Sequence, residues 1–397
     1  MKKTIYLYAA FLFFIACEPR ENLPFENVGD TFPVLKSVLE NTEKYQVQIL
    51  YSQINVDNDG KKSLDHYSFN LNDNQYFYPA STVKLPVAIL ALEWLAEQKN
   101  DMLSMDSPMQ TDSIRPSQSA AQYDSSAFSG FPSIGHYIKK ILLVSDNDAY
   151  NRLYELLGQD YINSKLSAKG LANTIINHRL SIPMSPEENR QFNPITFYDD
   201  DFNPILHIPS SNTQKVYQNS NKPHIGKAYY ENGEKIEKSM DFSFKNRLSI
   251  SDLHGIIQRV VFPEMFSKDE QFHITESDRD FLLKYMSMYP KASDYPAYPE
   301  TSYPDSYSKF YKFGTSSEPI PKQFKIYNKT GQAYGHLLDS SYIVDEDEGI
   351  EFLVSAVIYV NENETLNDNQ YEYDQIGFPF FTELGEYLYQ LELKRKL

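Results

Sequence analysis

Three short patterns of polar residues in this chain could carry out nucleophilic chemistry together. In chain order they are Ser81-Thr82-Val83-Lys84, Ser145-Asp146-Asn147 and Lys329-Thr330-Gly331. A serine hydroxyl is a weak nucleophile until a base takes its proton, and a lysine whose pKa is lowered by burial or by a second cation can be that base. Ser81 and Lys84 stand three residues apart, so a helix places both on one face. The chemistry expected of such a set is acyl transfer through a serine ester.

Each pattern taken alone also has an ordinary structural explanation. Ser81 could cap a helix, with Lys84 solvated in its first turn. Ser145-Asp146-Asn147 could be a turn that caps the next helix, and Lys329-Thr330-Gly331 could be the end of a strand. Together, in this order and each in a suitable context, the three patterns favour a catalytic site.

The elements predicted around the patterns supply that context. Apolar residues cover several helical faces of 85–95, so the helix that begins near Ser81 should be central and buried. The second pattern lies between helices predicted over 133–144 and 148–157, and Gly158 is the expected C-terminal stop of the latter. The third pattern follows the strand-like run 324–328 and is expected on an inner strand edge.

Strands at both ends of the chain, with helices between them, predict one α/β (α+β) domain. Its expected form is an antiparallel sheet flanked by helices, plus a helical subdomain. The remaining elements are a helix over 32–42, strands over 47–54, 66–71, 337–344 and 351–360, and a closing helix over 380–393. The stretch 185–320 shows helical patterns only over 251–261 and 277–289. Its Tyr-, Pro- and Ser-rich part, 289–311, is typical of irregular surface.

On these three patterns, their order and their setting, the chain resembles class A of the serine β-lactamase and penicillin-recognising superfamily. The resemblance runs from about residue 32 to the C-terminus. The segment 166–171 and the following His178-Arg179-Leu180 are similar to the start of that family's omega loop.

The resemblance implies a role for each residue of the three patterns. Ser81 would attack the carbonyl, Lys84 would help to deprotonate it, and Ser145 would pass a proton to the leaving nitrogen. The implied substrate-binding residues are Asn147 for an amide, Lys329 and Thr330 for a carboxylate, and Gly331 and Gln332 on the strand beside the oxyanion. The oxyanion would lie between the backbone N–H groups of Ser81 and Gln332.

The chain departs from the family pattern in the omega loop. Class A β-lactamases carry a glutamate there, followed four residues on by asparagine, and this pair holds the hydrolytic water. Counted from Arg179, these positions hold Met184 and Glu188. Glu187 or Glu188 could act as the base only in a shifted loop, and without a positioned base water attacks the ester slowly. The expectation is therefore slow turnover of a β-lactam.

A second departure is the enlarged insertion around 185–320. It is either surface decoration or a lid or groove wall that shapes a different substrate site. The leading hypothesis is a serine hydrolase acting on a β-lactam or a cell-wall-peptide-like amide or ester. The alternatives are a penicillin-binding or substrate-binding lipoprotein with little or no turnover, and a cell-wall peptidase or esterase.

The N-terminus predicts export and lipid anchoring. Residues 1–16 read as a lipoprotein signal peptide, Cys17 as the lipidated residue, 17–31 as a tether and 32–397 as the hydrolase domain. Cys17 is the only cysteine, so an internal disulfide is excluded. We therefore expect the chain in the cell envelope, attached to a bacterial membrane through Cys17. We also expect it to be a monomer.

Composition and residue spacing limit the other ligands and partners that the chain could bind. A formal net charge of −17 argues against nucleic acid as a partner, because nucleic-acid binding requires clustered Lys and Arg. The histidines show no His-Glu-x-x-His spacing, and no glycine-rich phosphate loop is present. We expect no metal and no cofactor.

Overall fold

A six-stranded sheet joins the two ends of the chain in the computed structural model, which describes residues 20–21 and 23–396. Its strand order is β1 (Arg20–Glu21), β3 (Lys62–Phe69), β2 (Gln48–Val56), β15 (Ile350–Tyr359), β14 (His336–Asp345) and β13 (Phe324–Ala333). Only β1 pairs in parallel; the other neighbours are antiparallel. The predicted α/β (α+β) class is confirmed.

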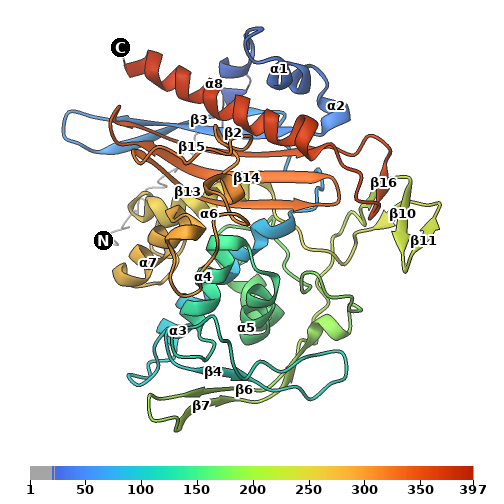
Figure 1. The fold of residues 1–397 in the computed structure, drawn as a ribbon, viewed down its shortest axis with the longest axis vertical. Coiled ribbons are helices and arrows are strands. Elements are labelled where there is room, and N and C mark those ends of the chain that lie inside the picture. Colours follow the sequence, from blue (N-terminus) through green and yellow to red (C-terminus); the bar gives the residue numbers. More distant parts are fainter. Residues whose placement is uncertain (1–19, 22, 397) are drawn as a thin grey trace, which may run out of the picture.

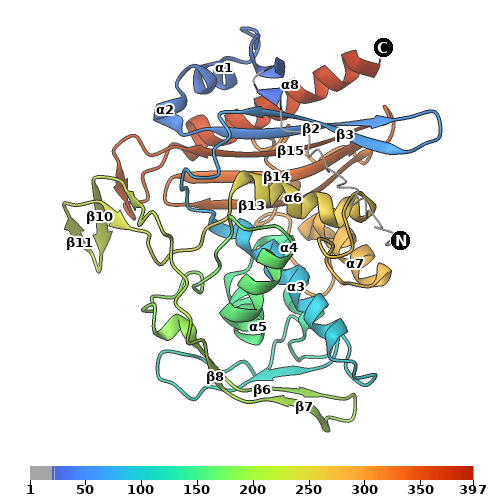
Figure 2. The same cartoon turned by 180° about the vertical axis from the view of Figure 1, so that it is seen from behind.

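Helices cover both faces of this sheet (Figures 1 and 2). One face carries α1 (Pro33–Glu40), α2 (Thr42–Tyr45) and α8 (Phe378–Lys396). On the other face, α6 (Ile250–Val261) lies between the sheet and a helical part that contains α3 (Lys84–Glu97), α4 (Ile134–Val144), α5 (Asn147–Ala168) and α7 (Glu276–Ser287). Each face has its own hydrophobic core, so β14 and β15 are buried on both sides.

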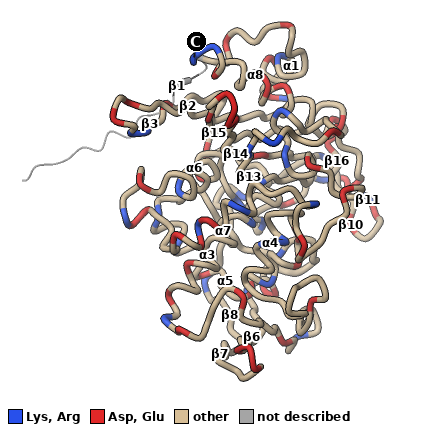
Figure 3. Tube along the Cα trace, turned by 60° about the vertical axis from the view of Figure 1, so that its left-hand side comes forward, with Lys and Arg blue, Asp and Glu red and all other residues tan. Residues whose placement is uncertain are grey.

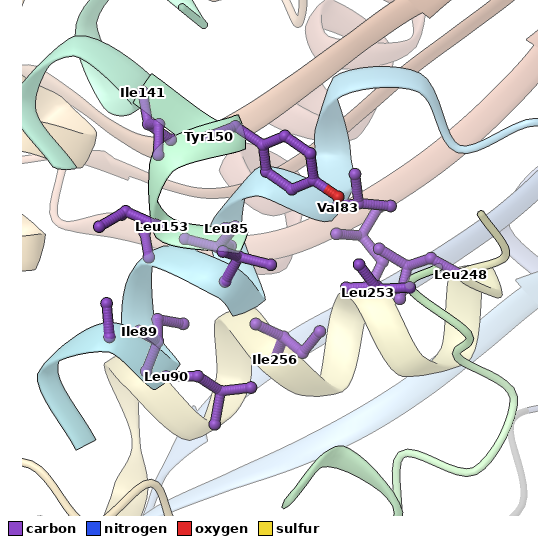
Figure 4. Close-up of a cluster of buried hydrophobic side chains, with 14 of the residues drawn as sticks. Val83, Leu85, Ile89, Leu90, Ile141, Tyr150, Leu153, Leu248, Leu253 and Ile256 are labelled. Carbon is purple, nitrogen blue, oxygen red and sulfur yellow. The ribbon is translucent and has the colours of Figure 1, made fainter. Parts of the chain in front are cut away.

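Helix α3 is the centre of the helical part, as its all-round apolar pattern predicts. Every residue from 84 to 93 is buried. Leu85, Ile89 and Leu90 of α3 belong to one cluster of buried hydrophobic side chains with Leu153 of α5 and Ile256 of α6 (Figure 4). The first turn of α3 is preceded by a short 3-10 turn, Ala80–Val83, which contains Ser81.

The predicted stop of the third helix at Gly158 is confirmed, because Gly158 has non-helical dihedrals, φ 70° and ψ 158°; a second helical segment continues α5 beyond this kink to Ala168. Two other predictions about local structure are wrong. The segment 289–311 is not all surface, because its last residues, Phe310 and Tyr311, pack against Phe381 of α8. Strand β13 is also the outermost strand of the sheet and not an inner one.

Short strands that the sequence pattern does not reveal fill much of the stretch 185–320. Two-residue strands are β5 (Gln191–Phe192), β8 (Ser211–Asn212), β9 (His224–Ile225) and β12 (Met240–Asp241). Longer ones are β6 (Ile195–Tyr198) and β7 (Pro204–Ile208), which join β4 (Met109–Thr111), and β10 (Ala228–Glu231) and β11 (Glu234–Ile236). Strand β10 pairs in parallel with β16 (Thr365–Leu366), so the insertion is tied to a segment near the C-terminus.

The predicted signal peptide and Cys17 lie outside the described residues. The folded part begins earlier than the predicted boundary at residue 32, because β1 pairs with β3 and the buried Phe25 contacts Phe69. No helix in the described part of the chain is long and apolar enough to span a membrane. Lys and Arg are scattered among Asp and Glu along the trace, and the Asp199–Asp201 run falls in the turn between β6 and β7 (Figure 3).

Candidate active site

Ser81 lies in a tight turn that presents its hydroxyl at the surface of the buried helix α3. The backbone nitrogen of Thr82 and its Oγ1 both donate to the Pro79 carbonyl, at 3.1 and 2.6 Å. Ala80 has φ 48°, a conformation that few residues other than glycine adopt. These bonds and this backbone conformation fix the direction of the Ser81 side chain, which stays partly exposed.

Lys84 is fully buried, so the ordinary explanation of a solvated lysine is wrong. Its Nζ lies 2.8 Å from Ser81 Oγ. It also lies 2.5 Å from the Ser145 carbonyl oxygen, 3.2 Å from Ser145 Oγ and 2.7 Å from Asn147 Oδ1. Burial lowers the pKa of Lys84 well below its ordinary value, and the Lys329 charge lowers it further, while Asp146 opposes both. A neutral lysine at hydrogen-bond distance from a serine hydroxyl can accept its proton.

The second pattern sits between α4 and α5, as predicted. Ser145 ends α4 with φ 59°, and Asp146 caps α5 by accepting from the Ala149 nitrogen at 2.8 Å. The capping explanation is therefore correct for Asp146, while the two neighbouring side chains face the site. Ser145 Oγ lies 2.8 Å from Lys329 Nζ and Asn147 donates to Ser181 Oγ at 2.8 Å.

The third pattern lies inside β13 and not at its end. Lys329 is 3% exposed, and its Nζ also donates to the Thr330 carbonyl at 2.9 Å. Burial lowers the pKa of Lys329 to about 7, with Asp339 raising it and Lys309 lowering it. Lys329 can therefore change charge near neutral pH.

Strand β13 approaches the Ser81 turn at Gly331. A Cβ on Gly331 would lie 2.9 Å from the Pro79 carbonyl oxygen and 3.1 Å from the Ser81 nitrogen. Only glycine allows this contact between two backbones. The next residue, Gln332, is exposed and lines the same cavity as Ser81. The backbone nitrogens of Ser81 and Gln332 are thus on two chain segments that meet beside the hydroxyl.

The cavity at Ser81 has a volume of about 620 Å³. Three residues of the predicted site line it: Ser81, Asn147 and Gln332. The others belong to segments that the patterns do not mark: Tyr78, Ala80, Leu180, Ser181, Ala333, Tyr334, Asn367, Asn369, Tyr371, Tyr373 and Asp374. The 367–374 part of this wall follows directly after β16, which pairs with β10 at residues 365 and 366, and no local sequence pattern signals that pairing.

The loop that follows Arg179 does not bring its glutamates to this cavity. Arg179 pairs with Glu155 at 3.0 Å. Glu188 accepts from the Ser185 nitrogen at 2.8 Å, and the Glu187 side chain is 68% exposed and lies 3.7 Å from Arg190. Neither glutamate lines the Ser81 cavity, where Asp374 supplies the carboxylate among the lining residues. Within residues 20–21 and 23–396, no cluster of three His, Cys, Asp or Glu side chains is arranged to hold a metal.

Comparison with known proteins identifies the family of this chain and proteins that share its fold. The family model described as "Beta-lactamase enzyme family" matches residues 34–287. The match ends before the third pattern, which the fold brings to Ser81. No curated protein matches the chain in sequence.

The overall structure is similar to solved structures at low sequence identity. The structure of PBP-A is 14% identical, with 96% of this chain and 98% of that chain covered and a TM-score of 0.50. The β-lactamase of Desulfarculus baarsii DSM 2075 is 12% identical, with 91% and 99% covered and a TM-score of 0.46. The β-lactamase from Streptomyces albus G is 12% identical, with 90% and 99% covered and a TM-score of 0.47. The likeness to PBP-A shows a shared fold.

Proposed function

Because the chain belongs to the beta-lactamase enzyme family, we propose that it is a serine hydrolase that carries its acyl-enzyme on Ser81. The substrate is a β-lactam or a related amide or ester. The observation that carries this proposal is the 2.8 Å distance between the Ser81 hydroxyl and the Nζ of buried Lys84, whose pKa is lowered by burial and by Lys329, which favours the neutral amine. This arrangement gives the hydroxyl a base.

Acylation begins when Ser81 Oγ bonds to the substrate carbonyl carbon and its proton moves to neutral Lys84. The backbone N–H groups of Ser81 and Gln332 donate to the oxyanion. The C–N bond then breaks, and the Lys84 proton reaches the leaving nitrogen through Ser145 Oγ, which lies 3.2 Å from Lys84 Nζ. A β-lactam loses no fragment in this step, because its nitrogen stays attached through the opened ring.

Substrate binding is assigned to the residues around this path. Asn147 binds the amide of the acyl part, and Lys329 and Thr330 bind a carboxylate on the leaving side, beside Gly331. In favour of this division, Lys329 contacts Ser145 Oγ, while Asn147 and Gln332 line the open cavity. Water then hydrolyses the ester and restores the Ser81 hydroxyl.

A penicillin-binding protein with little turnover is the second candidate. It is favoured by one observation: neither Glu187 nor Glu188 lines the Ser81 cavity. A role for either glutamate as the hydrolytic base stays a prediction that requires the loop to move. A cell-wall peptidase or esterase would use the same acylation steps on a peptide or ester.

The location is part of the proposal. Cys17 is the lipidated residue of an exported chain, which attaches the enzyme to a bacterial membrane in the cell envelope, where β-lactams and cell-wall peptides occur. The support is sequence alone: an apolar run too short to span a bilayer, followed by the single cysteine.

Intact-protein mass spectrometry with benzylpenicillin tests the acylation step. The expected result is an adduct on Ser81 with the full mass of the penicillin, absent in Ser81→Ala and nearly absent in Lys84→Ala. Ser63→Ala, an exposed serine on β3, is the matched control and should acylate like wild type. A lasting adduct identifies a penicillin-binding protein, and a transient adduct with ring-opened product identifies a β-lactamase. An adduct that persists in folded Ser81→Ala would end the assignment of the nucleophile.

A further inference from the structure

A second cavity of about 650 Å³ adjoins the Ser81 cavity. The two share Tyr78, Ser181 and Tyr334 as lining residues, so the second cavity lies directly beside the one that contains the nucleophile. One wall of the second cavity is the loop 178–189, and the other comes from the insertion, at Glu231, Met240, Asp241, Phe244 and Lys245. The first cavity alone has the size of a typical small-molecule site, so the second offers room for a longer substrate.

Lys245 is a half-buried cation without a partner in this second cavity. Its Nζ forms no ion pair and donates no hydrogen bond within the described part of the chain. Its backbone is nevertheless fixed, since its nitrogen donates to the Phe242 carbonyl at 3.0 Å and its carbonyl accepts from Asn219 at 2.9 Å. Burial lowers the pKa of Lys245. A half-buried ammonium in the wall of a cavity, without a counter-ion, favours an anionic ligand.

The other charged groups of the cavity are already engaged or point to solvent. Arg179 pairs with Glu155 at 3.0 Å. Asp241 is exposed and accepts from the Ser243 nitrogen at 2.7 Å, and Glu231 is exposed at the end of β10. Lys245 is therefore the lining cation that is free to bind a carboxylate.

The position of the cavity indicates which part of a substrate it would hold. Ser145, Lys329 and Thr330, which receive the leaving group in the proposed function, line neither cavity. Asn147 and Gln332 do line the first one. The group that extends from Ser81 past Tyr334 into the second cavity is thus the acyl part, which stays on the serine.

We propose that the second cavity is a subsite for an acyl chain that ends in a carboxylate, bound by Lys245. The inference rests on the proposed function and narrows its substrate class to acidic, peptide-like acyl donors. A hydrogen bond between charged partners contributes more than a neutral one, so a carboxylate donor should acylate Ser81 about tenfold faster than its carboxamide.

Two penicillins test the subsite: 6-glutarylaminopenicillanic acid and its terminal carboxamide. They differ in one charge at the far end of the acyl chain and share every group near the ring. The measurement is the second-order rate of adduct formation on Ser81, followed by mass spectrometry on the full chain. Wild type should prefer the carboxylate, Lys245→Met should acylate both at the carboxamide rate, and Lys245→Arg should keep the preference.

Lys268→Met, an exposed lysine that lines neither cavity, is the matched control and should keep the wild-type preference. Equal rates for the two penicillins in wild type overturn the subsite while leaving the acyl-enzyme intact. A preference retained in Lys245→Met, folded by its Tm, overturns it as well. Absence of any Ser81 adduct from either penicillin overturns the proposed function and the subsite together.

Discussion

The backbone of Gly331 lies so close to Ser81 that a Cβ added to Gly331 would be 3.1 Å from the Ser81 nitrogen. Two of the three nearest obstacles to that Cβ, the Ser81 nitrogen and the Pro79 carbonyl oxygen, are backbone atoms and cannot rotate away; the third is the Thr82 Cγ2 methyl at 3.1 Å. The contact brings β13 directly against the turn that precedes α3. The geometry of the proposed oxyanion site, between the Ser81 and Gln332 nitrogens, therefore depends on this glycine.

Gly331→Ala should separate β13 from the Ser81 turn. Misplacement of reacting groups by about 1 Å costs about 100-fold in rate, so we expect acylation by benzylpenicillin to slow by about that factor. Overpacking should also lower stability by about 1–3 kcal/mol, measured by denaturant unfolding. Gly29→Ala is the control, because nothing lies within 4 Å of a Cβ there. An unchanged acylation rate in Gly331→Ala would contradict the tight contact.

The sequence predicts which polar side chains meet at the candidate site better than it predicts the walls of the cavity. The three patterns lie in elements that local periodicity reveals, and the structure brings Ser81, Lys84, Ser145 and Lys329 together as predicted. The walls depend on pairing between β10 and β16, which are two to four residues long and far apart in the chain. Such short strands have no period to detect, and long-range pairing leaves no local pattern.

The buried residues beneath the site are also not predictable from local sequence patterns. Lys309 lies in a segment whose Tyr, Pro and Ser content is typical of surface, yet it is 1% exposed and donates to Asn328 Oδ1 at 2.5 Å. Asn328 in turn donates to Asp339 at 2.9 Å. A buried lysine is stable only with such partners, and those partners come from two strands that composition does not connect to it.

Cys17→Ala tests the predicted lipid anchor. The change removes the only thiol that could carry the lipid, so the exported chain should move from the membrane fraction to the soluble envelope fraction of a bacterial host. Acylation of Ser81 by benzylpenicillin should stay unchanged, because Cys17 precedes the folded domain. Immunoblots of the two fractions give the distribution. A Cys17→Ala chain that stays membrane-bound after a high-salt wash would contradict lipidation at this residue.

Glu187→Gln and Glu188→Gln test the hydrolytic step. Because Glu188 is held by the Ser185 nitrogen and Glu187 faces solvent, we expect either change to alter the decay rate of the penicillin adduct by less than about threefold. The first-order loss of the adduct, followed by mass spectrometry after removal of free penicillin, gives that rate. General base catalysis contributes about 100-fold or more, so a slowing of that size would show that the loop moves in the acyl-enzyme.

The charge of Lys329 should set the pH dependence of acylation through Lys84. Lys84 must be neutral to accept the Ser81 proton, so the rate should rise with pH as Lys84 loses its own proton. Removal of the Lys329 cation in Lys329→Met takes away an interaction that lowers the pKa of Lys84. The folded-state pKa of Lys84 then rises. The rising limb of the plot of acylation rate against pH therefore moves to higher pH.

The choice of substrate separates the influence of Lys329 on the pKa of Lys84 from the role of Lys329 in binding a substrate carboxylate. With a neutral p-nitrophenyl ester, only the proton transfer is measured, and the limb should shift in Lys329→Met but not in Lys325→Met on the same strand. With benzylpenicillin, the wild-type rate should also fall above about pH 7, because the pKa of Lys329 is about 7 and the neutral form binds the substrate carboxylate more weakly. The ester profile should lack that fall. A rising limb that stays in place in Lys329→Met would show that Lys84 is not the base whose charge Lys329 controls.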